Sequence, residues 1–245
     1  RFHYNRGAPV LYLKFDEGEG KIAYDSSGSE NHGTIYGATW TQGKFGSALE
    51  FDGTDDYVDC GNNSLLQFSG NDKYTIEAWI KPFVNSSNNI IVARRSSSSY
   101  ERNYVLTLND NSQVVFMFNQ GSNLPQWISK DSINLNEFSH VVTVVDLTGE
   151  NAENTVKFYI NGKFSPSTFK GDPSLDPNTG DFRLIIGKDL FYGKVFNGII
   201  DEVKIYNYAR TPDEIRLDYN AGLAVKLGGS PSQINWTYEK TFSFK

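Results

Sequence analysis

Short apolar runs, separated by glycines and other turn-forming residues, recur along most of this chain. Runs of roughly four to eight β-branched and aromatic residues between such turns are typical of β-strands. Residues 211–222 instead carry the signals of a helix. We therefore expect an all-β fold, a two-sheet antiparallel jelly-roll sandwich with one short C-terminal helix. The expected strands cover residues 10–15, 48–51, 57–59, 74–81, 90–94, 104–108, 114–118, 139–145, 155–160, 183–186 and 198–206.

The sharpest turn signal is the dipeptide Asn161-Gly162, which separates the apolar residues 158–160 from Phe164. Both central positions of a type I′ turn need a positive φ angle, which asparagine and glycine tolerate best. The dipeptide therefore predicts a two-residue β-hairpin.

Residues 198–206 predict the last strand. Ile199, Val203 and Ile205 alternate along it, and by this alternation Asp201 falls on the same face. A carboxylate on an apolar, inward face is unfavourable unless another group pairs with it. A bound cation would be one such partner.

The helix that follows begins with a recognisable capping pattern. Thr211 is the expected N-cap and Pro212 the first helical residue, and Glu214, three residues after the cap, completes a capping box. Gly222 is expected to end the helix, because glycine is common just past a helix C-terminus.

Composition restricts what the chain can bind. It has 245 residues, 38% of them hydrophobic, which is enough for one sandwich domain with a sizeable core. Its net charge is −6, so we expect no nucleic-acid partner, because nucleic-acid binding needs a basic surface.

Cys60 is the sole cysteine and excludes an intramolecular disulfide. No apolar run reaches the length of a membrane span and no signal peptide is recognisable, so we expect no direct membrane insertion.

Four further motifs accompany residues 198–215. They are residues 11–18 (LYLKFDEG), 24–33 (YDSSGSENHG), 46–58 (GSALEFDGTDDYV) and 74–82 (YTIEAWIKP). In this order and spacing they resemble the LamG-like (laminin G, concanavalin A-like lectin/glucanase) jelly-roll family, over about residues 10–222. The resemblance implies the fold, an extracellular or cell-surface location and a binding role, and it leaves the ligand open.

The resemblance also divides the chain. Residues 1–222 are expected to form the LamG-like jelly-roll domain, and residues 223–245 a C-terminal extension. Within the extension, residues 234–238 alternate as a strand would. This run would form an edge strand or a tether to a following domain; alternatively, it would add to the sheet edge of another subunit.

Calcium is the cofactor that the resemblance implies, since related jelly rolls often use a structural cation to join their terminal strands to a nearby loop. By that resemblance the expected ligands are Asp201 first, then Asp16, Asp25 and Asn31, side chains of the oxygen type that calcium prefers. The alternative is that Asp25 and Asn31 cap turns and that Asp201 accepts backbone hydrogen bonds. The acidic residues 52–56 are interpreted as a hairpin turn rather than as a metal site.

The sequence gives little support for catalysis. Glycoside hydrolysis needs two carboxyl groups about 5 to 10 Å apart across a cleft. The expected strand at residues 74–81 carries Glu77 as its one acidic residue, and we expect that side chain on a solvated face. The chain is therefore not expected to be an enzyme.

Sugar binding requires an aromatic ring against the C–H face of the sugar, beside polar groups that bond its hydroxyls. Such residues gather in the expected loops, and the candidates for ligand contact are Tyr100, Arg102, Gln120, Trp127 and Tyr192. The alternative is that aromatic residues fill the core. The sequence thus predicts a non-catalytic extracellular module that binds a glycan. The alternative function is a structural or adhesive domain that binds a surface protein or other subunits.

Overall fold

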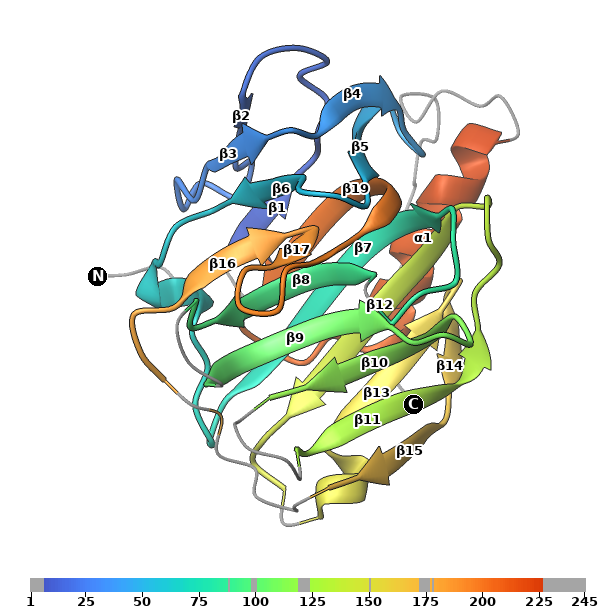
Figure 1. The fold of residues 1–245 in the computed structure, drawn as a ribbon. Helices are drawn as coiled ribbons and strands as arrows, with labels where there is room; N and C mark the ends of the chain where they lie inside the picture. Colours follow the sequence, from blue (N-terminus) through green and yellow to red (C-terminus); the bar gives the residue numbers. More distant parts are fainter. Residues whose placement is uncertain are drawn as a thin grey trace, which may run out of the picture.

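Two antiparallel β-sheets pack face to face, and helix α1 (Pro212–Lys226) lies against the outer face of one of them (Figure 1). The computed structural model describes residues 7–87, 89–97, 101–118, 124–149, 151–171, 177 and 179–226, with side chains up to residue 221. The expected all-β jelly-roll sandwich with a C-terminal helix is confirmed.

The eight-stranded sheet is the one that α1 covers. Its strands are β1 (Leu11–Leu13), β4 (Thr39–Gln42), β5 (Ser47–Asp52), β7 (Lys73–Pro82), β12 (Ser139–Asp146), β13 (Val156–Ile160), β14 (Lys163–Ser165) and β19 (Asn197–Tyr206). They lie in the order β14-β13-β12-β7-β19-β5-β4, and β1 also pairs with β19.

The nine-stranded sheet forms the other layer. Its strands are β2 (Ile22–Ala23), β3 (Gly33–Tyr36), β6 (Tyr57–Asp59), β8 (Ile90–Arg95), β9 (Arg102–Leu108), β10 (Gln113–Met117), β11 (Gln126–Ser132), β15 (Ser167–Lys170) and β16 (Arg183–Ile186). Their order is β15-β11-β10-β9-β8-β16-β6-β3-β2. A small ribbon of β17 (Lys188–Asp189) and β18 (Lys194–Val195) follows β16, and two 3-10 turns, η1 (Ser64–Leu66) and η2 (Ala152–Asn154), lie in connections.

The core lies between the two sheets. Because successive side chains of a strand point to opposite faces, each strand contributes alternate residues to it. Ile76, Ala78 and Ile80 of β7 belong to the same buried cluster as Leu106 of β9 and Phe116 of β10. This cluster holds the layers together and leaves the outer faces of both sheets for other contacts.

The local turn and cap signals are confirmed. At the hairpin between β13 and β14, Asn161 has φ 52° and Gly162 has φ 74°, as a type I′ turn requires. At the start of α1, the Thr211 backbone N–H donates to Glu214 Oε2 at 2.7 Å, and the Glu214 N–H donates to Thr211 Oγ1 at 3.3 Å. This reciprocal pair is the expected capping box.

The expected end of the helix is wrong. α1 continues through Gly222 to Lys226, because a glycine inside a helix costs only about 1 kcal/mol relative to alanine and does not remove a hydrogen bond. The helix therefore crosses the expected boundary at residue 222. The strand-like run at residues 234–238 lies outside the described residues.

A β-bulge in β19 changes which side chains face the core. The register against β7 shifts after Asp201, and Glu202 adopts φ 53°. An extra residue in a strand reverses the alternation beyond it. Val203 and Ile205 therefore join the core, whereas Asp201 lies opposite Trp79 on the face that α1 covers. The expectation that Asp201 shares a face with Val203 and Ile205 is wrong for this reason.

Glu77 on β7 is fully buried under α1. Its Oε1 lies 3.0 Å from His140 Nε2 and 3.2 Å from Lys204 Nζ, and Arg210 Nη1 bridges Glu77 and Asp218. Burial by itself would raise the pKa of the Glu77 carboxyl, but Lys204, His140 and Arg210 together hold that pKa well below its usual range. The expectation of a solvated Glu77 is wrong, because the helix covers this face of the sheet.

Candidate functional site

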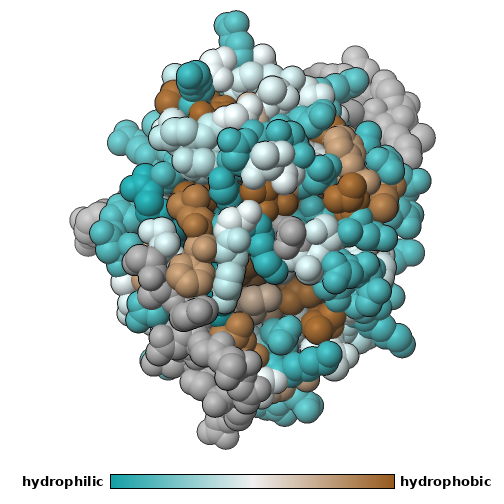
Figure 2. Space-filling model, viewed as in Figure 1, coloured by the Kyte–Doolittle hydropathy of each residue, from teal (hydrophilic) through white to brown (hydrophobic). Residues whose placement is uncertain are grey.

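The nine-stranded sheet turns its outer face toward the viewer in Figure 1, and α1 lies on the far side of the sandwich. Figure 2, seen from the same side, shows hydrophobic and hydrophilic residues interspersed over this face. Hollows here are lined by side chains of β3, β6, β8, β16 and the β17–β18 ribbon. These hollows make this face the candidate ligand-binding surface.

A pocket of about 470 Å³ lies beside β3 and β6, and we call it the tyrosine pocket. Tyr36 and Tyr57 stand opposite each other on these strands, with ring centroids 4.6 Å apart and 15° between the ring planes. Their neighbours Ile35 and Val58 belong to the core, so strand alternation turns both tyrosines outward. Tyr36 is 46% exposed. The lining residues are Lys21, Thr34, Ile35, Tyr36, Gly37, Asp55, Tyr57 and Lys188.

Charged groups surround the stacked rings. Lys188 Nζ lies 5.1 Å from the centroid of the Tyr57 ring and donates to the backbone carbonyl of Asp55 at 3.1 Å. The side chains of Lys21 and Asp55 are exposed and line the same pocket. Burial, with a smaller effect of Tyr36, raises the pKa of the Tyr57 phenol, so its hydroxyl stays protonated and can donate. A ring platform with ammonium, carboxylate and hydroxyl groups around it can hold a ligand rich in hydroxyls.

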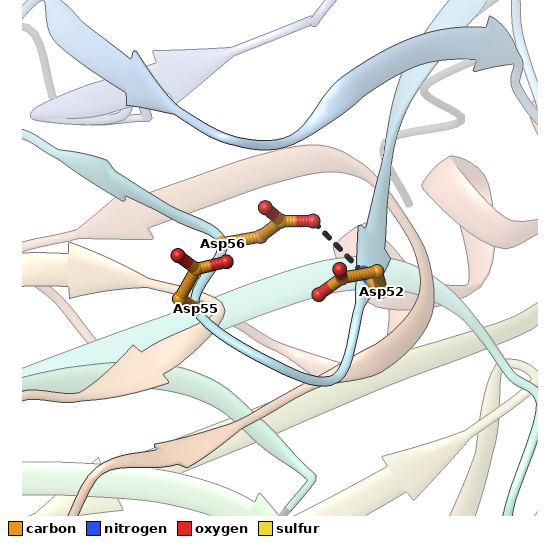
Figure 3. Close-up of side chains that lie close together, drawn as sticks. All are labelled: Asp52, Asp55 and Asp56. Atoms are coloured by element: carbon orange, nitrogen blue, oxygen red, sulfur yellow. Dashed lines mark hydrogen bonds between the residues drawn. The ribbon is translucent and has the colours of Figure 1, made fainter.

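Three carboxylates gather at the turn between β5 and β6 (Figure 3). One oxygen from each of Asp52, Asp55 and Asp56 lies within 4.8 Å of the others, and they form the one such acidic group within the described part of the chain. Asp56 is buried, and its Oδ2 accepts the backbone N–H of Asp52 at 2.8 Å. Burial raises the pKa of the Asp56 carboxyl, against the effect of that hydrogen bond. The hydrogen bond is that of a turn, as expected, and the three carboxylates supply oxygen atoms of the kind that bind cations.

A second organised group, the Arg95–Asp189 cluster, consists of Arg95, Arg102, Asp189, Phe191 and Tyr192. Arg95 Nη1 lies 2.7 Å from Asp189 Oδ2, and these side chains are 3% and 4% exposed. Asp189 Oδ1 accepts the backbone N–H groups of Phe191 and Tyr192 at 2.9 and 3.1 Å. The Arg95 guanidinium carbon lies 4.7 and 4.9 Å from the centroids of these two rings. The ion pair thus orients Tyr192, which is 48% exposed.

Two hollows adjoin the Arg95–Asp189 cluster. The larger, of about 240 Å³, is lined by Asn62, Arg95, Ser97, Asp181, Arg183 and Leu190. The smaller, of about 80 Å³, is lined by Ser87, Ile90, Arg95, Arg102, Val105, Thr107, Met117, Asp189, Tyr192 and Lys194. Arg95 lines both hollows, whereas Asp189 lines the smaller one.

The structure brings two of the predicted ligand residues together. Arg102 is buried and shares a side-chain hydrogen bond with Tyr192. Trp127 is different, because it lies on β11 rather than in a loop, is fully buried in the core and donates to the Ala152 carbonyl at 2.8 Å. The expectation that Trp127 contacts a ligand is wrong, since it has no exposed surface. Tyr100 and Gln120 lie outside the described residues.

The predicted metal ligands Asp25 and Asn31 hold the chain together by hydrogen bonds. Asp25 Oδ1 accepts the backbone N–H of Tyr12, and its Oδ2 accepts that of Asn31, each at 2.9 Å. Asn31 Nδ2 donates to the Val10 carbonyl at 2.9 Å, and its Oδ1 accepts from Asn63 at 2.7 Å. These bonds account for both side chains without an ion, in line with the turn-capping alternative.

Asp201 and Asp16 lie beside the turn at residues 43–46. Asp201 is fully buried, and its Oδ2 accepts the backbone N–H groups of Lys44 and Phe45 at 2.8 and 3.1 Å. Its Oδ1 has no hydrogen-bond partner among the described residues. Burial raises the pKa of the Asp201 carboxyl to about 8, although the Phe45 N–H opposes this and Glu202 adds to it. An orphaned buried oxygen fits either a proton or a cation, so Asp201 remains a chemically suitable calcium ligand. Asp16 is exposed.

The sequence reasoning missed the tyrosine pocket. Its residues come from β3, which was not predicted, from β6, and from the ribbon after β16. The available signal was the alternation of Thr34-Ile35-Tyr36 and Tyr57-Val58-Asp59, in which each tyrosine lies next to an apolar residue. The pairing of the two strands, which brings the rings together, could not be read from either segment alone.

Comparison with known proteins assigns the fold to a family. The Laminin_G_3 model, of the concanavalin A-like lectin/glucanases superfamily, matches residues 52–216. The chain belongs to this superfamily. The human adhesion G-protein coupled receptor D1 is 36% identical over 69 residues, which are 28% of this chain and 8% of the receptor. The matched segment is therefore a small part of the receptor's length.

Solved structures of binding domains share the fold of this superfamily member. Domain 4 of AbnA, an extracellular arabinanase from Geobacillus stearothermophilus, was solved with arabinotriose. It aligns with a TM-score of 0.60 and 22% identity, over 86% of this chain and 98% of that domain. The binding domain of botulinum neurotoxin DC was solved with rat synaptotagmin II. It gives a TM-score of 0.61 and 16% identity, over 88% of this chain and 52% of that one. Within the described residues, no helix combines the length and apolar character needed to cross a bilayer.

Proposed function

We propose that this chain is a non-catalytic carbohydrate-binding module and that the tyrosine pocket is its primary sugar site. The observation that carries the proposal is the stacked pair of Tyr36 and Tyr57 on a sheet face, where Tyr36 is half-exposed and Lys21, Asp55 and Lys188 surround the rings. Ligand sites combine an apolar platform with a few placed polar groups in this way.

The pocket offers each kind of contact that a sugar needs. The C–H face of a sugar ring would pack on the exposed face of Tyr36, which supplies apolar area with few rotatable bonds. The Asp55 carboxylate would accept from sugar hydroxyls, and the ammonium group of Lys21 would donate to them. The rim of the pocket thus carries one carboxylate, that of Asp55, and two ammonium groups, those of Lys21 and Lys188. Acceptors and donors side by side suit a polyhydroxylated ligand.

The relatives support an extracellular binding role. The AbnA domain comes from an extracellular enzyme and was solved with arabinotriose, so an oligosaccharide is the first ligand class to test. An extracellular or cell-surface location would agree with that relative and with the adhesion receptor. We expect no nucleic-acid partner, given the net charge of −6.

The contacts and positions of the acidic side chains agree with a non-catalytic role. The carboxylate of Glu77 is occupied by Lys204 and Arg210 under α1. Asp55, the acidic residue that lines the tyrosine pocket, shares one turn with Asp52 and Asp56 instead of facing another carboxylate across a cleft. Glycoside hydrolysis needs the latter arrangement.

Calcium would serve as a structural ion at Asp201 rather than at the sugar site. Its buried, unbonded Oδ1 could ligate the ion, with the nearby Asp16 and Glu202 carboxylates adding negative charge. The ion would fix the turn at residues 43–46 to β19. It would neutralise a carboxylate whose charge is otherwise buried.

The first experiment is a binding screen against a broad glycan array, with calcium and with a chelator, followed by titration of the retained sugars. Tyr36→Ala should weaken binding about tenfold or more, since aromatic contacts are worth about 1 kcal/mol or more beyond burial. Phe164→Ala is the matched control, because Phe164 is an exposed aromatic (55%) on β14 of the other sheet. A domain that retains no glycan, or a Tyr36→Ala variant that binds as the parent does, contradicts the proposal.

The alternative function is recognition of a protein, as in an adhesive or structural assembly. It is favoured by the botulinum neurotoxin DC binding domain, which shares the fold and was solved with rat synaptotagmin II. It predicts that glycans are not retained and that removing residues 227–245 changes the oligomeric state, which light scattering would detect.

A further inference from the structure

The outer face of the nine-stranded sheet carries organised side chains well beyond the tyrosine pocket. We propose that the Arg95–Asp189 cluster is a second saccharide contact, so that the module binds a neutral oligosaccharide chain lying across the strands. This inference rests on the proposed carbohydrate-binding function and specifies its ligand as a chain rather than a single terminal sugar.

The two groups are neighbours on one face. Lys188 of β17 lines the tyrosine pocket, and the next residue, Asp189, anchors the Arg95–Asp189 cluster. Between them, Arg183 of β16 pairs with Asp59 of β6, Nη2 to Oδ2, at 2.6 Å. The strand order β3-β6-β16-β8 places three strand spacings between Tyr36 and Arg95, and the strand registers displace the two residues by about four positions along the strands. They are therefore roughly 19 Å apart, from about 14 Å across the sheet and about 13 Å along it. An oligosaccharide can span this distance, whereas one sugar unit cannot.

The Arg95–Asp189 cluster has the construction of a binding site. Removing Arg95 and Asp189 from water costs several kcal/mol per ion, which their attraction repays only with good geometry and further hydrogen bonds. Here both side chains are almost fully buried, with Arg95 on β8 and Asp189 on the surface ribbon. The pair holds the ribbon in place and presents Tyr192, still half-exposed, at the smaller of the two hollows. An oriented aromatic ring next to a hollow repeats the chemistry of the tyrosine pocket.

The charges around the larger hollow indicate a neutral ligand. The guanidinium groups of Arg95 and Arg183 are each paired with a carboxylate, Asp189 and Asp59 respectively. The remaining polar lining is the Asn62 amide, the Ser97 hydroxyl and the Asp181 carboxylate. Paired charges offer little net attraction for an anion, while amide, hydroxyl and carboxylate groups suit sugar hydroxyls.

The test measures affinity against chain length with arabino-, xylo-, cello- and laminari-oligosaccharides, from disaccharide to hexasaccharide, by calorimetric titration. For the parent, affinity should rise about tenfold or more from disaccharide to hexasaccharide. Tyr192→Ala should remove that gain and leave disaccharide affinity unchanged, because the disaccharide occupies the tyrosine pocket alone. Phe164→Ala again serves as the control.

A second variant guards against a folding defect. Leu190→Trp fills the 240 Å³ hollow that Leu190 lines, instead of removing a contact, and should likewise abolish the gain from chain length. If hexasaccharides bind no better than disaccharides, or if both variants bind hexasaccharide as the parent does, the second contact is overturned while the tyrosine-pocket proposal stands. If the parent binds no oligosaccharide of the panel and no glycan of the array, the proposed function itself fails.

Discussion

The Lys204 ammonium lies 3.2 Å from the Glu77 carboxylate in the layer between β7 and α1. Arg210 bonds the same carboxylate from the segment that precedes the helix. The carboxylate thus fastens the C-terminal helix to the sheet through charges of opposite sign. Breaking a buried pair by removing one partner leaves an uncompensated charge, which costs far more than losing a surface ion pair.

Glu77→Gln should therefore destabilise the fold by about 3–5 kcal/mol, measured by urea denaturation near neutral pH. The pKa of Glu77 is lowered in the folded state, so its contribution is present above its ordinary pKa of about 4.5 and is lost as pH falls below it. The variant should consequently show a weaker loss of stability in acid than the parent. Glu19→Gln, at an exposed position, is the control, and a Glu77→Gln variant as stable as this control would refute the role of the network.

Two buried arginines should respond in opposite ways to the same substitution. Arg94 is 1% exposed, and its Nη2 donates to the Asn62 carbonyl at 3.2 Å, while Nε and Nη1 have no partner among the described residues. Burial lowers the pKa of its guanidinium, which reflects the cost of that charge. Arg94→Met should raise stability by about 1 kcal/mol or more, whereas Arg210→Met should lower it by about 3–5 kcal/mol. Thermal unfolding of both variants measures these effects as changes in melting temperature relative to the parent. Changes of the same sign in the two variants would contradict the prediction.

Local signals were the most predictable part of this fold. The Thr211 cap and the Asn161-Gly162 turn depend on residues close together in sequence, and both formed as expected. The side of β19 on which Asp201 lies depends on a bulge, and the bulge has no signal in the alternation of apolar residues.

The candidate site was harder to predict because it depends on pairing between distant segments. Tyr36 and Tyr57 come together only because β3 pairs with β6. Trp127 looked like a loop residue among polar neighbours, but β11 pairs with β10 and turns the ring into the core. Glu77 looked solvated because the strand pattern cannot show that α1 lies over it. Composition and the alternation of apolar residues describe one strand at a time. The surroundings of the two tyrosines, of Trp127 and of Glu77 depend on which other strand or helix packs against that strand.

The hairpin turn at Gly162 should be sensitive to a single methyl group. Its φ of +74° is strained for any residue with a Cβ, and a Cβ there would lie 2.8 Å from Tyr219 Cδ1 on α1. Gly162→Ala should therefore lower stability by about 1–2 kcal/mol. Gly149→Ala is the matched control, since nothing lies within 4 Å of its added Cβ and its φ is not positive. Equal unfolding midpoints for the two variants in urea would contradict this account.

The ionisation of Asp201 should make the stability of the fold depend on pH, and the direction of that dependence differs with and without bound calcium. Without an ion, burial raises the pKa of its carboxyl to about 8 in the folded state, against an ordinary value of 3.8. The folded state then holds a proton that the unfolded state releases, so stability should fall as pH rises from about 4 to about 8. Asp201→Asn keeps an oxygen that can accept from Lys44 and Phe45 but cannot ionise, and it should flatten this dependence.

Calcium should reverse this fall of stability with rising pH, because the ion binds the ionised Asp201 carboxylate and competes with the proton. In millimolar calcium, the parent should melt at a higher temperature than in chelator, and the difference should grow with pH. Asp201→Asn should lose most of that difference, while Asp55→Asn, in the exposed turn beside the tyrosine pocket, should retain it. Calcium stabilisation that survives Asp201→Asn but is lost in Asp55→Asn would instead place the ion at the acidic turn of Asp52, Asp55 and Asp56.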